Sequence, residues 1–176
     1  MSTSTKENEL ILRNVRGRYL SLFEPNEFKG KSRYGMTIVI PKKDKAMIKE
    51  ITAIQDRLIK EKYTRSVPGS LKKLLNESDL GDEYYALKAY RQLKQRAPVV
   101  LGRDATPINA GAVDAPYDGC WMDVKVAFYI PKDHDTVCAT LLIVQFRGDG
   151  DPLSAATPVV MPGEFGAVPD EVSDLI

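Results

Sequence analysis

The most regular pattern in this sequence is a strict alternation of apolar side chains across residues 120–130 ("CWMDVKVAFYI"). Successive side chains of a β-strand point to opposite faces, so a period of two is typical of a strand that covers a core with one face. The pattern therefore predicts a half-buried strand. Its expected core face holds Cys120, Met122, Val124, Val126, Phe128 and Ile130, and its other face holds Trp121, Asp123, Lys125 and Tyr129.

Other strand-like segments occur on both sides of this one. Residues 34–40 ("YGMTIVI") are rich in β-branched side chains and stop at Pro41, which has no N–H to donate to a sheet. Apolar or alternating runs predict further strands at residues 10–23, 84–91, 98–101 and 137–146. Pro25 and Gly30 bracket a predicted polar loop, and residues 131–136 ("PKDHDT") form a predicted hairpin loop.

Residues 44–63 change to helical spacing. Apolar residues recur there at intervals of three and four, which places Met47, Ile48, Ile51, Ile54, Leu58 and Ile59 on one face of an amphipathic helix. Asp44 is placed to cap the helix N-terminus. The charged residues of the opposite face are interpreted as solvated surface, and residues 64–83 as an irregular excursion with one helical turn.

The predicted elements restrict the fold class. Five or six strands with one early helix, and no alternating βαβα series, exclude a doubly wound nucleotide-binding sheet. A mainly β fold accommodates them as an OB-fold barrel with an inserted helix, and a β-sandwich is the alternative that periodicity leaves open. The expected organisation is a disordered arm over residues 1–8, the OB-fold domain over residues 9–153, and a flexible acidic tail over residues 154–176.

No motif for catalysis or cofactor binding stands out. The sequence contains neither G-x-x-x-x-G-K-S/T nor G-x-G-x-x-G, which argues against ATP or dinucleotide use. His134 lies in a predicted turn, and Cys120 and Cys138 lack the close spacing of zinc or redox motifs. We therefore expect a protein that is not an enzyme and uses no cofactor or metal. With no apolar run near the roughly 20 residues that cross a bilayer and no signal-peptide pattern, we expect no membrane partner and a cytoplasmic location.

Charge is divided sharply along the chain. All 25 Lys and Arg lie at or before Arg147, together with 18 of the 24 acidic residues, so this part carries a net charge of +7. Residues 148–176 carry the other six acidic residues and no Lys or Arg, a net charge of −6. This division predicts a body that binds a polyanion and an acidic tail.

Three segments interleave basic and aromatic residues, at residues 13–19, 28–34 and 88–96. Binding single-stranded DNA without sequence preference needs cations for the phosphates and flat side chains on which bases stack, and these segments supply both. For the aromatic residues, packing in the core or at the barrel rim is the alternative, as it is for Trp121. The predicted DNA contacts are Arg13, Arg16, Arg18, Tyr19, Phe28, Lys31, Arg33, Tyr34, Lys88, Tyr90, Arg91, Lys94, Arg96 and Trp121.

Longer blocks of the sequence resemble a known family. "NVRGRYLSLFEPNEFKGKSRYGMTIVIPKKD", then "RAPVVLGRDATPI", "YDGCWMDVKVAFYIP" and "LLIVQFRGDGDPL" are similar in order and spacing to the phage single-stranded DNA-binding proteins of the Enc34-like family. This resemblance implies an OB barrel, sequence-tolerant binding of single-stranded DNA in phage replication and recombination, and no cofactor. It does not identify individual contact residues.

The C-terminus, "PDEVSDLI", is similar to the acidic tails of bacterial and phage single-stranded DNA-binding proteins. Such a tail docks replication proteins and competes electrostatically with DNA, so the residues expected to serve this role are Asp170, Glu171, Asp174, Leu175 and Ile176. An unstructured terminus without a partner is the alternative. For the whole chain, two other functions remain open: a phage structural or assembly protein whose β-domain binds another protein, and an RNA-binding OB module.

Overall fold

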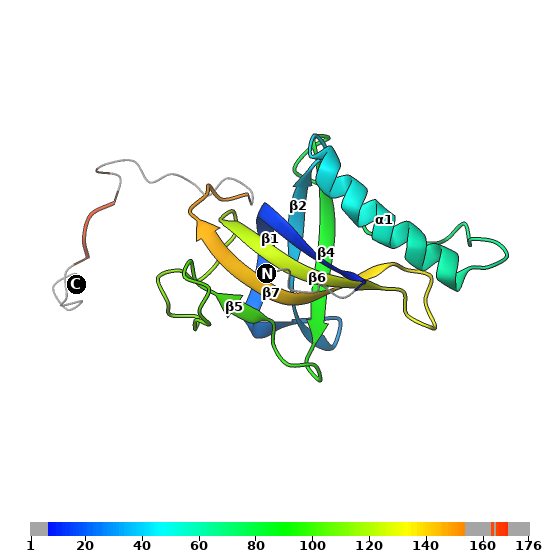
Figure 1. Cartoon of the computed structure of the whole chain (residues 1–176). Helices are drawn as coiled ribbons and strands as arrows, with labels where there is room; N and C mark the ends of the chain where they lie inside the picture. The colour runs from blue at the N-terminus through cyan, green and yellow to red at the C-terminus, as the bar shows by residue number, and fades with distance from the viewer. Residues whose placement is uncertain (1–6, 154–162, 164, 169–176) are drawn as a thin grey trace.

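The computed structural model describes residues 7–153, 163 and 165–168, and it shows a β-barrel with one long helix along its side (Figure 1). The elements are β1 (Glu9–Phe28), β2 (Lys31–Pro41), α1 (Lys45–Lys62), β3 (Asn76–Glu77), β4 (Tyr84–Gln92), β5 (Val99–Leu101), β6 (Trp121–Tyr129) and β7 (Cys138–Gly148). All the strands and the helix expected from the sequence are present, and β3 is additional. The five tail residues predicted to dock partners lie outside the described part of the chain.

Pairing between β4 and β7 closes the barrel. The strand order is β3-β4-β2-β1-β6-β7-β5, and an additional parallel pairing joins β4 to β7, so β4, β2, β1, β6 and β7 form a closed ring. β3 and β5 lie at the periphery, each paired with one barrel strand. A five-stranded closed barrel of this kind agrees with the predicted OB-fold and not with a sandwich of two sheets.

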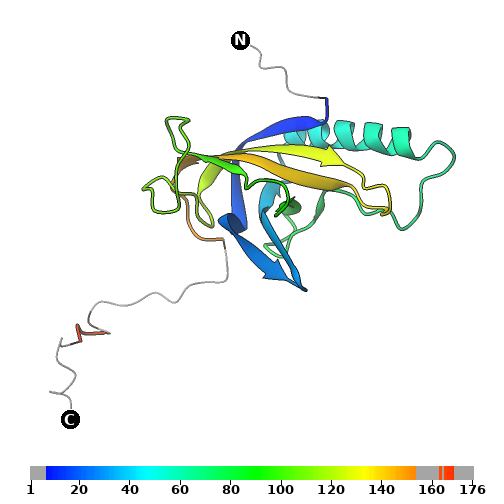
Figure 2. The ribbon, with the colours of Figure 1, turned by 90° about the horizontal axis from the view of Figure 1, so that it is seen from below.

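The connection between β1 and β2 differs from the sequence prediction. A polar loop bracketed by Pro25 and Gly30 was expected, but β1 continues through this stretch and the turn consists of Lys29 and Gly30 alone. Both residues have positive φ (51° and 76°), as a two-residue hairpin turn requires. Pro25 is tolerated because it falls where the pairing register shifts, between Ser21 and Asn26. The hairpin projects from the barrel (Figure 2).

The core lies inside the barrel and beneath α1. On β6, the alternate residues predicted to face inward are buried, and Met122, Val124, Val126 and Phe128 are at most 1% exposed. Ile51 and Ile59 of α1 join the same cluster. The helix begins as predicted, because the Asp44 side chain accepts a hydrogen bond from the backbone N–H of Met47 (3.2 Å).

Residues 64–83 contain no helical turn, so that part of the prediction is wrong. The segment is instead tied to its neighbours by backbone and side-chain hydrogen bonds. The Lys72 N–H donates to Asp135 O (3.0 Å), the Val137 N–H donates to Lys72 O (2.8 Å), and the Leu74 N–H donates to Oε1 of the buried Gln55 (2.8 Å). These hydrogen bonds hold Lys72 and Lys73 beside the start of β7.

The described residues contain neither a membrane-spanning helix nor a metal-binding cluster. Within residues 7–153 and the short described stretches after them, no helix has the length and apolar character needed to span a bilayer. The same part of the chain contains no cluster of three or more His, Cys, Asp or Glu side chains arranged to hold a metal ion.

Candidate nucleic-acid interface

Cross-strand register brings side chains of β1, β2 and β4 into rows on the outer face of the barrel. Residues directly opposite one another on neighbouring strands point to the same face. Ser21 of β1 lies opposite Gly35 of β2, which lies opposite Tyr90 of β4. In the next row Thr37 of β2 lies opposite Lys88 of β4. The inner face of the same strands carries the buried Met36, Ile38 and Leu87, so the rows with Tyr90 and Lys88 face outward.

Two adjoining hollows run over this face. The larger has a volume of about 930 Å³ and the smaller about 430 Å³, and both are lined by Arg33, Lys88 and Tyr90. We call the two together the β2–β4 groove. Its basic and aromatic lining residues are Tyr19, Lys31, Arg33, Lys72, Lys73, Lys88, Tyr90, Lys94 and Tyr129.

The charge of the groove is strongly one-sided. Its lining contains six Lys or Arg and one acidic residue, Glu77. Glu77 is itself paired with Lys42 outside the groove, at 2.7 Å between Oε2 and Nζ. A concave surface with one sign of charge concentrates counter-ions of the opposite sign, so the groove is suited to a polyanion such as a nucleic-acid backbone.

Tyr90 forms a flat platform in this groove. The Arg33 guanidinium lies over the Tyr90 ring, 3.6 Å from Cζ to the ring centroid. Beneath the ring lies Gly35, where a Cβ would stand 2.4 Å from Tyr90 Cδ1 and 2.8 Å from the backbone oxygen of Ala89. Glycine in the middle of a strand costs stability and often marks a close approach, and here any larger residue would collide with the Tyr90 ring and with the backbone of β4. Ring and guanidinium together supply the two groups that single-strand binding uses.

Cys138 and Tyr129 also line the larger hollow, near the loop between β6 and β7. Burial raises the pKa of the Cys138 thiol, and burial together with the neighbouring Cys138 raises the pKa of Tyr129. Both groups are therefore uncharged at neutral pH and do not offset the positive charge of the groove.

Six of the fourteen predicted DNA contacts line the groove: Tyr19, Lys31, Arg33, Lys88, Tyr90 and Lys94. Sequence reasoning missed Lys72, Lys73 and Tyr129. The signal for the first two was a pair of adjacent lysines in a segment without periodicity, and only the hydrogen bonds to the start of β7 bring this pair to the groove. Tyr129 was assigned to the outward face of its strand, which is where the structure has it.

Four other predicted contacts do not line the groove. Arg18 is buried, with its side chain 7% exposed and its guanidinium paired with Asp79. Tyr34 and Arg91 lie opposite one another on the inward side of β2 and β4, and Arg91 Nη1 donates to Leu141 O (3.3 Å). Arg96 follows β4 and accepts a hydrogen bond from Arg91 Nε through its backbone oxygen. The side chain of Phe28 lies outside the described part of the structure.

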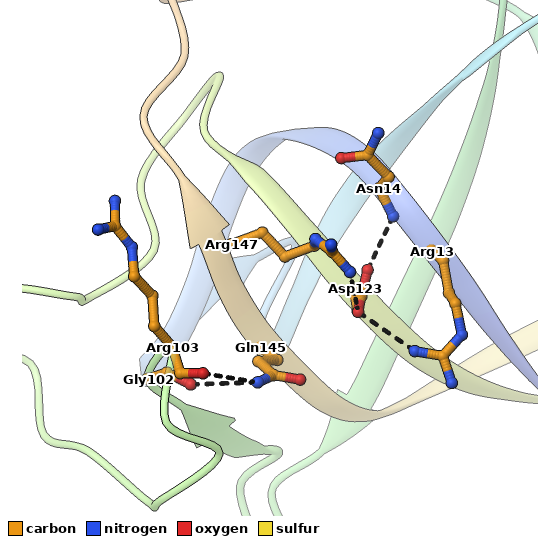
Figure 3. Close-up of polar contacts among 7 residues, drawn as sticks. All are labelled: Arg13, Asn14, Gly102, Arg103, Asp123, Gln145 and Arg147. Atoms are coloured by element: carbon orange, nitrogen blue, oxygen red, sulfur yellow. Dashed lines mark hydrogen bonds and ion pairs between the residues drawn. The ribbon is translucent and has the colours of Figure 1, made fainter.

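The remaining three predicted contacts, Arg13, Arg16 and Trp121, gather on the outer face of β1, β6 and β7. Arg16 donates through Nε to Gly119 O (2.9 Å), and its guanidinium lies 5.3 Å from the centre of the Trp121 ring. Arg13 and Arg147 both contact the carboxylate of Asp123 (Figure 3). This second group of basic side chains is thus separate from the lining of the groove.

Comparisons with known proteins agree on the fold. The structure is similar to the single-stranded DNA-binding protein from bacteriophage Enc34 in complex with single-stranded DNA, with a TM-score of 0.69 and 22% identity over 84% of this chain and 90% of that one. A C-terminal truncation of the Enc34 protein gives a TM-score of 0.66 and 24% identity, covering 84% of this chain and 89% of that one. The gp2.5 single-stranded DNA-binding protein encoded by bacteriophage T7 gives 0.59 and 13%, covering 90% of this chain and all of that one.

These likenesses confirm the predicted OB-type barrel. No curated protein sequence matches the chain significantly. The model of the family described as "Enterobacter phage Enc34, ssDNA-binding protein" matches residues 8–173, nearly the whole chain. The chain therefore belongs to the Enc34 single-stranded DNA-binding protein family.

Proposed function

We propose that this chain binds single-stranded DNA in the β2–β4 groove with little preference for base sequence, and that it acts by binding and not by catalysis. The observation that carries this proposal is the Arg33–Tyr90 platform in the middle of six basic side chains. Cations neutralise phosphates and an aromatic face accepts any base, so neither contact reads the base edges that distinguish one sequence from another.

The position of the groove supports the same function. OB-folds bind oligonucleotides on the face of their second and third barrel strands and with the loops between strands 1 and 2 and strands 4 and 5. Counted along the chain, the second and third barrel strands are β2 and β4, and the two loops are the Lys29–Gly30 turn and the loop between β6 and β7. Lys31 beside the first loop and Thr136 in the second both line the groove.

We infer from family membership that the protein acts in phage DNA replication, in the cytoplasm of the host cell. The separation of +7 from −6 along the chain supports a further role for the acidic tail, as a docking segment for replication proteins that competes with DNA for the groove.

Gel-shift titrations with single-stranded DNA, duplex DNA and RNA of equal length test this proposal. Single-stranded DNA should bind most tightly, and the logarithm of the binding constant should fall linearly with the logarithm of salt concentration, by about 0.7 per neutralised phosphate. The double variant K88A/K94A should reduce this slope by about 1.4. The matched variant K49A/K60A removes the same charge from exposed positions of α1 and should leave the slope unchanged.

Tighter binding of duplex DNA or RNA would contradict the assignment to single-stranded DNA. Equal slopes for K88A/K94A and K49A/K60A would show that the β2–β4 groove is not the binding surface.

A further inference from the structure

We propose that Arg13 and Arg147, positioned by the buried carboxylate of Asp123, form a second phosphate-binding surface for single-stranded DNA that extends past the β2–β4 groove. The proposal rests on the proposed function and lengthens the path that the bound DNA follows over the protein. We call Arg13, Asp123 and Arg147 the arginine pair site (Figure 3).

The carboxylate of Asp123 anchors this site. Its side chain is 8% exposed, and it accepts hydrogen bonds from the Asn14 N–H (2.8 Å), from Arg147 Nη1 (2.9 Å) and from Arg13 Nη1 (3.4 Å). These three donors come from β1 and β7, on either side of β6. A buried carboxylate that accepts these three hydrogen bonds holds both guanidinium groups at a defined place on the surface.

Both arginines nevertheless reach solvent. The Arg13 and Arg147 side chains are 67% and 49% exposed, and each engages Asp123 through one terminal nitrogen. A guanidinium has five N–H donors in a planar fork that suits phosphate oxygens, so donors remain for a ligand. Two positive groups around one carboxylate leave a net charge of +1. Because the carboxylate already orders the side chains, less conformational entropy is lost when a phosphate binds.

Strand β1 connects the arginine pair site to the groove. Tyr19 of β1 lines the groove and is 58% exposed, and Arg16 lies opposite Trp121, which is 37% exposed. From residue 19 to residue 13 a strand advances about 20 Å at roughly 3.3 Å per residue, a span of a few nucleotides. The exposed rings of Tyr19 and Trp121 lie along this path and offer faces on which bases can stack.

Two of the acidic groups near this path, Asp118 and Asp149, are engaged with the protein. The exposed Asp151 also lies near the path, since its backbone oxygen accepts a hydrogen bond from Arg16. Asp118 accepts hydrogen bonds from the backbone N–H groups of Tyr19 (3.2 Å) and Leu20 (3.3 Å). Asp149 accepts a hydrogen bond from the hydroxyl of Tyr117 (2.7 Å). Their negative charges weaken the positive electrostatic potential along the path. The arginine pair site contributes to binding only when the bound DNA is long enough to reach it.

Oligonucleotide length separates this site from the groove. A single OB-fold covers about 4–16 nucleotides, so an oligonucleotide of about 8 nucleotides fills the groove, and one of about 16 nucleotides also reaches the arginine pair site. The test variant is R13A/R147A/D123N, in which Asn at position 123 keeps an oxygen for the Asn14 N–H and leaves no buried charge without a partner.

For the long oligonucleotide, the variant should bind several-fold more weakly at low salt, with a salt slope about 1.4 smaller because two phosphate contacts are lost. Binding of the short oligonucleotide and the melting temperature should stay close to those of the unaltered protein. K49A/K60A serves as the charge control, with both oligonucleotides bound normally.

Unchanged binding of the long oligonucleotide would overturn the inference, and so would an equal loss at both lengths. The proposed function is tested independently, by whether the unaltered protein binds the short oligonucleotide and whether K88A/K94A weakens that binding.

Discussion

Tyr90 and Tyr34 provide a matched pair of tyrosines on neighbouring strands with opposite orientations. Tyr90 lies in the groove against Arg33. Tyr34 lies two residues before the buried Met36 and therefore on the same, inner face of β2. The sequence placed both in the DNA-binding set. The geometry leads us to expect that Tyr90→Ala weakens DNA binding and that Tyr34→Ala weakens the fold.

The expected magnitudes follow from what each ring contacts. A base stacked on an aromatic side chain is worth about 1–3 kcal/mol, so Tyr90→Ala should weaken binding between roughly 5-fold and 150-fold. Tyr90 is half-buried on the outer face, and its replacement should cost about 0.5–1 kcal/mol of folding free energy through the lost contact with Arg33. Tyr34 is partly buried, so its replacement should cost about 1–3 kcal/mol of folding free energy, less than the 3–5 kcal/mol of a fully buried aromatic residue.

Fluorescence titration with a labelled oligonucleotide and thermal denaturation measure the two effects separately. For a chain of this size, each kcal/mol of lost stability lowers the melting temperature by about 2–4 °C. Tyr90→Phe is the control, since it keeps the ring and should bind almost normally. Gly35→Ala tests whether the position of the Tyr90 ring matters for DNA binding. The added Cβ would stand 2.4 Å from Tyr90 Cδ1, so the ring would have to move.

One pattern of results would refute this reasoning. If Tyr34→Ala weakened DNA binding while Tyr90→Ala bound normally, the outer face of β2 and β4 would not be the surface on which bases stack. If Gly35→Ala bound DNA as tightly as the unaltered protein, the orientation of the Tyr90 ring would not matter for binding.

Three further outcomes are expected. The variant K72A/K73A should reduce the salt slope for single-stranded DNA by about 1.4 in gel-shift titrations; an unchanged slope would remove the segment before β3 from the interface. Deleting residues 169–176 should raise affinity for DNA at low salt and less so at high salt, since a tethered acidic segment competes at high effective concentration; identical titrations at every salt concentration would exclude competition. A hydrogen bond to Asp135 raises the pKa of Tyr63 to about 12, so this contact stabilises the fold fully below about pH 10 and is lost as the pH rises toward 12. Tyr63→Phe should flatten the fall in melting temperature over that range, and an equally steep fall would show that other groups cause it.

The parts of the fold that local patterns govern could be predicted from the sequence. The period of two across residues 120–130 corresponds to β6, and the spacing of apolar residues across residues 44–63 corresponds to α1 with its Asp44 cap. Each of these two patterns depends only on residues close together in the sequence, so it can be recognised without knowledge of the tertiary packing. Resemblance to the family supplied the barrel topology, which periodicity alone left open against a sandwich.

Which residues share a face was decided by the tertiary structure. In β1 the register shifts at three places, and Asn14 and Tyr19, which lie at the first two, have positive φ (57° and 54°). Each irregularity interrupts the alternation of faces, so counting along the sequence does not tell which arginine of β1 reaches solvent. Arg18 is buried against Asp79 for this reason, while Arg13 is exposed.

The candidate site likewise has a part that the sequence predicted and a part that only the tertiary structure decided. The sequence by itself determined the chemistry of binding, because basic and aromatic residues interleave in three segments that each carry their own signal. Only the folded barrel determined which of these residues form one groove, since β2–β4 register selects Arg33, Lys88 and Tyr90, and hydrogen bonds between segments 65 residues apart bring Lys72 beside them. Such contacts join residues distant along the chain, and no local pattern encodes them.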